Sequence, residues 1–106
     1  MALRPIAQVA LPATTLTDLY TALTPSLGYV KLSSVVFCNR VNSQVNIRFS
    51  IAPGGAADAV NQYLYFDFPL VPNDTFALAL DIGLAPKDVV RAYASAAQVT
   101  VSLFGE

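Results

Sequence analysis

The sequence predicts an all-β protein, an antiparallel β-sandwich of about eight strands with jelly-roll or immunoglobulin-like topology. The first observation is a strict alternation of apolar and polar side chains, as over residues 45–51, which gives a strand one buried and one wetted face. The second is a turn signal about every 8–12 residues, the spacing expected of a sandwich or barrel. The third is the lack of any long helical pattern. A closed barrel is the lesser alternative.

The N-terminal part of the chain allows two interpretations. Residues 6–11 predict a first strand, or an arm that reaches over a neighbouring subunit, so residues 1–12 are set apart from a single sandwich domain over 13–106. Residues 16–23 have apolar side chains at helical spacing, but their threonines favour a strand. The resemblance described below decides for a strand, and a turn is expected over 24–28.

Further strands are expected over 29–38, 44–52, 62–71, 75–84, 89–94 and 98–104. Residues 35–38 lose the alternation, which predicts a central strand that is buried on both faces. Pro72-Asn73-Asp74 and Pro86-Lys87-Asp88 predict type I turns, with the Asp88 carboxylate bound to backbone N–H groups. A loose loop is expected to open at Pro53-Gly54-Gly55.

Composition favours a protein that is covered by partners. Apolar residues make up 55% of the 106 residues and charged residues 12%, against usual shares of about 45–50% and about 25%. No apolar run approaches the about 20 residues of a spanning helix, so we expect no membrane partner. The net charge is −1 and the six cationic residues are scattered, which argues against nucleic-acid binding. Obligate interfaces tolerate this apolar surplus, so we expect a homo-oligomer.

The sequence offers little with which to do chemistry. It contains no histidine, and its seven acidic residues form no motif spacing, so no catalytic site, metal site or cofactor is predicted and the protein is not expected to be an enzyme. Cys38, the single cysteine, is expected in the core. With no internal disulfide, folding in a reducing cytoplasm suffices.

Several positions are predicted to meet a neighbouring subunit. Tyr63 and Tyr65 are expected to face outward, opposite Leu64, Phe66 and Phe68. Small apolar residues stand where the alternation predicts polar ones, at Ala77, Ala79, Ala92 and Ala94. The complete set of predicted interface residues is Ile6, Val9, Leu11, Tyr63, Tyr65, Ala77, Ala79 and Tyr93.

Three segments carry a resemblance to known proteins. They are Val36-Phe37-Cys38-Asn39-Arg40, residues 63–70 with Pro72-Asn73-Asp74-Thr75-Phe76, and residues 88–95 followed by 99–105. Together with the opening at 13–20, they resemble small structural proteins of tailed bacteriophages. In that group a Gly-Asp pair often starts the penultimate strand, where this chain has Lys87-Asp88.

The resemblance implies a virion component made in the host cytoplasm. A capsid decoration (cement) protein, bound to the major capsid protein, is the first expectation. A subunit of the neck, collar, tail or fibres, with a glycan- or receptor-binding role, is the alternative. Threefold points of an icosahedral shell favour a homotrimer.

Overall fold

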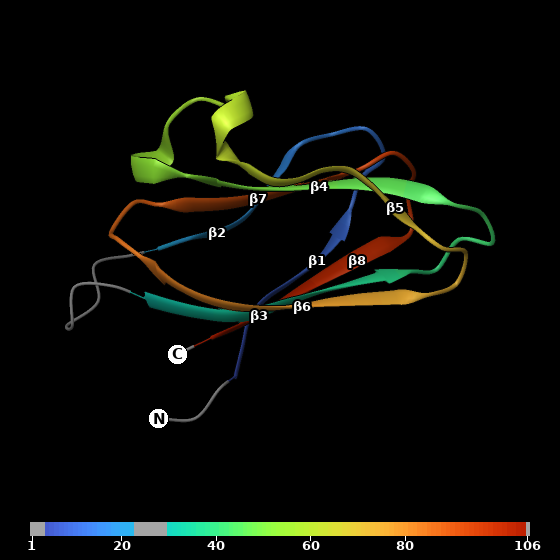
Figure 1. Ribbon diagram of the computed structural model, residues 1–106, viewed down its shortest axis with the longest axis horizontal. Coiled ribbons are helices and arrows are strands. Elements are labelled where there is room, and N and C mark those ends of the chain that lie inside the picture. Colours follow the sequence, from blue (N-terminus) through green and yellow to red (C-terminus); the bar gives the residue numbers. More distant parts are fainter. Residues whose placement is uncertain (1–3, 23–29, 106) are drawn as a thin grey trace.

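The computed structural model describes residues 4–22 and 30–105, and it confirms the predicted eight-stranded β-sandwich. The predicted turn over 24–28 lies outside the described residues. Two four-stranded antiparallel sheets pack against each other, and the body measures 43 × 31 × 18 Å (Figure 1). The strands are β1 (Arg4–Leu11), β2 (Thr17–Thr21), β3 (Val30–Asn39), β4 (Val45–Ala52), β5 (Tyr63–Leu70), β6 (Thr75–Leu84), β7 (Val89–Ala94) and β8 (Val99–Gly105). Two 3₁₀ turns, η1 (Pro53–Gly55) and η2 (Val60–Gln62), lie between β4 and β5.

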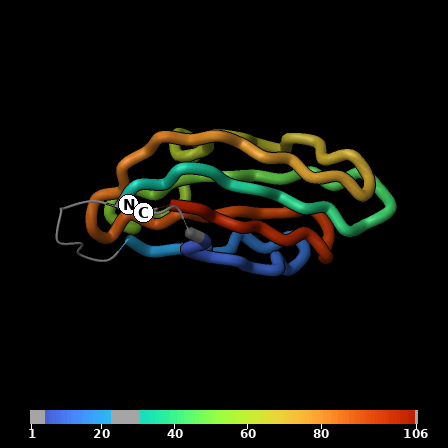
Figure 2. The backbone as a smooth tube through the Cα atoms, turned by 90° about the horizontal axis from the view of Figure 1, so that it is seen from below, coloured from blue at the N-terminus to red at the C-terminus, as the bar shows by residue number. Residues whose placement is uncertain are grey.

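The strand order is that of a jelly roll. Sheet A has the order β1-β8-β3-β6, and sheet B has the order β2-β7-β4-β5. First pairs with eighth, second with seventh, third with sixth and fourth with fifth, as in one long antiparallel ribbon rolled into two layers. Figure 2 shows the strands running along the long axis of the body. The structure therefore selects the jelly roll over the immunoglobulin-like order.

The N-terminal segment is a strand of the sandwich. β1 pairs antiparallel with β8 from Arg4 opposite Gly105 to Leu11 opposite Val99. Leu11 is 2% exposed and belongs to the core, so the prediction that its side chain forms an interface is wrong. Of the two alternatives, the structure adopts the strand and not the arm. Removing residues 1–11 would therefore remove β1 from sheet A.

The core lies between the two sheets and is built from the inward side chains of both. Phe37 of β3 and Phe49 of β4 meet edge to face across it, with ring centroids 6.1 Å apart. Both rings are fully buried, and each such ring contributes about 1.5–3 kcal/mol of transfer free energy. Asn39 is buried as well, and its amide donates to the carbonyl oxygens of Ser43 and Val71.

Three expectations about burial fail because the strands keep their two-residue period. Cys38 lies between the inward residues Phe37 and Asn39, so it faces outward and is half-buried instead of lying in the core. Ala92 and Ala94 are fully buried in the core, since on β7 it is Arg91 that points outward. β3 is central in its sheet, as predicted, but its outer residue Val36 is also only half-buried.

The two proline turns form where predicted but with a different backbone. Asp74 N–H donates to Val71 O, and Asp88 N–H donates to Ala85 O. The residues at the third turn position, Asn73 and Lys87, have φ of 55° and 75°. Positive φ at this position defines a type II turn, so the prediction of type I is wrong.

The carboxylate of Asp88 binds backbone N–H groups as expected. It accepts from Gly54 at 2.8 Å and from Ala85 at 2.9 Å. Asp88 therefore fixes both its own turn and the start of the loop after β4. Nowhere in residues 4–22 and 30–105 is a helix long and apolar enough to span a membrane.

Candidate interaction surface

Arg48 is the centre of a set of contacts on the outer face of sheet B. Its side chain points away from the core because both chain neighbours face inward. Its Cζ atom lies 4.1 Å from the ring centroid of Phe66 and 4.4 Å from that of Tyr93. Its Nε donates to Asp67 Oδ1 at 2.7 Å. Two rings and a carboxylate therefore fix the guanidinium in one orientation.

A β-bulge in β5 assembles these partners. Two residues of β5, Phe66 and Asp67, oppose the single residue Arg48 on β4. Asp67 adopts φ 53°, in the left-handed region that non-glycine residues rarely occupy. The bulge thereby brings an aromatic ring and a carboxylate to the same guanidinium, where a regular strand would offer one side chain.

The same bulge overturns part of the predicted facing of β5. The alternation predicted Tyr65 outward and Leu64 and Phe66 inward. Instead, Leu64 is 47% and Phe66 55% exposed. Tyr65 packs against Phe68 of β5 and Phe76 of β6, with ring centroids 5.1 and 5.6 Å away, and so lies against the core. Phe68 faces the core as predicted.

Tyr63 lies beside this site, and its ring contacts Phe66 edge to face at 5.1 Å. Its hydroxyl donates to Asp58 Oδ2 at 3.1 Å. Burial is the largest cause that raises the pKa of the Tyr63 phenol above its usual value, and the hydrogen bond to Asp58 adds to it. The phenol therefore stays protonated at neutral pH and acts as a donor. We call Arg48, Tyr63, Phe66, Asp67 and Tyr93 the Arg48 cluster.

The charges of this face are paired. The hydrogen bond with Asp67 is the largest cause that raises the pKa of Arg48, and burial opposes it. Arg91, on the neighbouring strand β7, donates from Nε to Asp18 Oδ1 at 2.8 Å. Each of these two arginines thus stands beside one carboxylate, so the four groups together add no net charge to the face.

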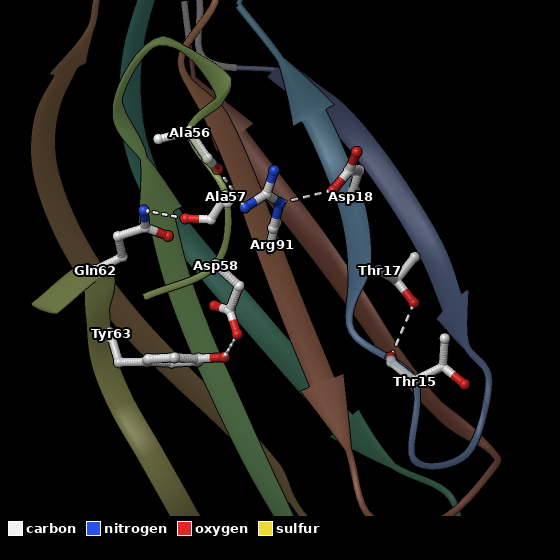
Figure 3. Close-up of polar contacts among 9 residues, drawn as sticks. All are labelled: Thr15, Thr17, Asp18, Ala56, Ala57, Asp58, Gln62, Tyr63 and Arg91. Atoms are coloured by element: carbon white, nitrogen blue, oxygen red, sulfur yellow. Dashed lines mark hydrogen bonds and ion pairs between the residues drawn. The ribbon is translucent and has the colours of Figure 1, made fainter. Parts of the chain in front are cut away.

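The loop between β4 and β5 is fastened over one end of the same face (Figure 3). Arg91 extends between β2 and the loop, where its Nη1 donates to Ala56 O at 2.9 Å. Gln62 Nε2 donates to Ala57 O at 2.9 Å, and the Tyr63 hydroxyl reaches Asp58. The loop predicted from Pro53-Gly54-Gly55 is therefore held by side chains from β7, η2 and β5.

Exposed apolar side chains concentrate on and around β5. The large apolar residues that are most exposed are Val60 (86%), Leu64 (47%), Phe66 (55%) and Val71 (60%). A shallow groove of about 530 Å³ lies between the loop and strands β4 and β5, lined by Ile51, Pro53, Ala56, Ala57, Ala59, Asn61, Gln62 and Leu64. The edge of sheet B at β5 thus carries exposed apolar side chains beside the Arg48 cluster.

The predicted interface residues divide between three places. Tyr63 and Tyr93 both lie on the outer face of sheet B, and Arg48 stands between Tyr93 and Phe66. Ala77 and Ala79 are exposed on β6, in the other sheet. The rest, Ile6, Val9, Leu11 and Tyr65, pack against or within the core.

Sequence reasoning missed Arg48, Phe66 and Asp67 as members of one site. Regular alternation places Phe66 inward, and only the pairing of β5 with β4 reveals the bulge. One signal was present: aspartate is depleted in strands, and Asp67 stands in the middle of a predicted strand.

No metal site accompanies this surface in the part of the chain that the structure describes: there, no three His, Cys, Asp or Glu side chains gather around one point. Comparison of the chain with protein-family models, curated proteins and solved structures finds no match.

Proposed function

We propose that the protein is a bacteriophage virion structural protein, a capsid decoration (cement) subunit that works by packing and not by catalysis. The observation that carries the proposal is the Arg48 cluster beside the exposed apolar residues of β5. The resemblance of three segments to phage structural proteins supports the same role.

The chemistry of this surface suits a protein partner. Arginine and tyrosine are enriched at the energetic centres of interfaces, and charged groups without partners are depleted there. Arg48 is already ordered by Phe66, Tyr93 and Asp67, so its side chain loses little freedom on binding. Exposed Leu64 and Val60 extend the apolar area next to it.

In this role the chain is made in the host cytoplasm and binds the major capsid protein of the assembled shell. A subunit that binds only the assembled shell stabilises it by mass action. No cofactor takes part.

Deletion of the gene from the phage tests the proposal. We expect purified virions to contain the chain in many copies, and virions without it to release their DNA at a lower temperature. Adding purified wild-type protein restores the release temperature, whereas Phe66→Ala restores it poorly. Phe104→Ala removes a half-buried ring from the outer face of sheet A and serves as the matched control. Absence of the chain from virions would refute the proposal.

A second role is favoured by the polar groups around Phe66. An exposed ring next to a guanidinium and a carboxylate is a surface on which a sugar can stack and form hydrogen bonds. A neck, collar, tail or fibre subunit would use it to bind a glycan or receptor. This role predicts saturable glycan binding that is lost in Tyr63→Ala with the oligomeric state unchanged, whereas the decoration role predicts lost binding to virions.

A further inference from the structure

The sandwich has four strand edges, and three of them carry features that prevent pairing with another strand. β1 contains Pro5 next to a register shift. β2 is short, has a register shift and presents Asp18. β5 contains Pro69 and the bulge at Phe66 and Asp67. Because proline cannot donate to a ladder and bulges bend a strand, these edges resist further pairing.

The fourth edge, β6, has a stretch without any such feature. From Thr75 to Ala79 it pairs residue by residue with Cys38 to Ser34, and its only register shift comes after Ala79. The stretch contains no proline and no charge, and its outward side chains Ala77 and Ala79 are small and exposed. Among the described residues, no strand pairs with its other edge.

The inner side of β6 is also incompletely covered. Its inward residues Phe76, Leu78, Leu80 and Ile82 are all half-buried, whereas the inward residues of the adjacent strand β3 are fully buried. Phe76 closes part of this side by packing on Phe68 of β5 at 4.6 Å. The core is therefore open along β6.

We propose that β6 pairs antiparallel with β6 of a second copy, so that sheet A continues across a two-fold axis. The stretch is complementary to itself: with the axis at Ala77, Ala77 faces Ala77 of the other copy, and Phe76 faces Leu78. The pair has no charge to bury, and the two open cores merge into one. Pairing thus satisfies free backbone groups and covers half-buried apolar side chains at once.

A lysine at the axis tests this arrangement, because like charges directly opposite each other destabilise a strand pair. We expect the wild-type chain to be a dimer by size-exclusion chromatography with light scattering. Ala77→Lys raises the dimer dissociation constant about tenfold or more. Ala10→Lys, at an exposed alanine of β1 on the opposite edge of sheet A, leaves it unchanged. Circular dichroism verifies that each variant is folded.

Mixing Ala77→Lys with Ala77→Glu gives the sharpest readout. Only a pair with residue 77 at the axis places lysine opposite glutamate, so the mixture should form heterodimers that neither variant forms alone. A monomeric wild type, equal effects of Ala77→Lys and Ala10→Lys, or no gain on mixing would overturn the proposal. A trimer would also overturn it and would leave the virion role intact, since virion content and release temperature test that role separately.

Discussion

The two sheets share one core but present different outer faces. Sheet B carries two arginines, each beside an aspartate, and two aromatic rings that contact Arg48, with Tyr63 packed against one of them. Sheet A presents mostly small or uncharged side chains along its centre, such as Thr100, Ser102 and Val36. The inward residues of both sheets must be apolar to form the core, whereas the outward residues are not constrained in this way and can differ. In the roles proposed above, sheet B supplies the specific contacts with a partner and sheet A supplies a strand edge.

The largest loss of stability is expected on substitution of Arg91, whose side chain joins β2 and the loop between β4 and β5 to β7. Arg91→Ala removes the bond to Asp18 and leaves Ala56 O without its donor, which should cost about 2–3 kcal/mol of unfolding free energy. Urea denaturation measures this, and limited proteolysis should show faster cleavage in the loop over 53–62. The exposed Arg40 provides the control: Arg40→Ala should cost less than about 0.5 kcal/mol. Equal costs would contradict the special role of Arg91.

A smaller loss of stability is expected when the ion pair of Arg48 on sheet B is removed, and a still smaller one when that of Lys31 on sheet A is removed. Arg48→Ala loses two ring contacts and the Asp67 pair, together about 1–2 kcal/mol. Lys31→Ala on sheet A loses a pair with Asp81 at 3.2 Å whose side chains are 44% and 82% exposed, which should cost about 0.5 kcal/mol or less. Thermal unfolding of both variants measures the difference. If Lys31→Ala costs as much as Arg48→Ala, the contrast between the two faces is wrong.

The smallest expected effect is on the way in which the unfolding free energy depends on pH. Because the pKa of Tyr63 is raised in the folded protein, the folded state holds this proton more tightly than the unfolded chain does. Its contribution to stability is therefore complete below the unfolded pKa of about 10 and is lost as the pH rises through the higher folded value. When the pH is raised from neutral to above about 10, the unfolding free energy of Tyr63→Phe should therefore fall by less than that of the wild type. Parallel alkaline losses in both proteins would contradict this.

Most of the fold could be predicted from local chemistry. The two-residue period and the turn signals located seven of the eight strands, because these signals depend on near neighbours in the chain, whereas the resemblance decided for a strand at β2. Every predicted strand end lies within two residues of the observed one. The choice of jelly roll depends on which distant strands pair, and no local pattern contains that information. Lys87 illustrates a finer limit, since its φ of 75° is set by the turn and not by its own preference.

The site was predicted less completely. Tyr63 and Tyr93 were identified as surface tyrosines, but Arg48 and Asp67 were not connected to them. The connection requires the bulge, which shifts β5 by one residue and reverses the facing of Tyr65. A one-residue shift leaves the composition of the strand unchanged, so alternation alone gives the wrong face.

The pairing of β1 with β8 has a consequence for synthesis. On the ribosome, β1 emerges before its partner exists, and β8 follows the other seven strands. Sheet A therefore stays incomplete, with β3 also lacking a neighbour, until β8 has left the exit tunnel. Long-range pairing of this kind slows folding to about milliseconds to seconds. In the cell, the protein should thus fold after translation of β8 and not strand by strand.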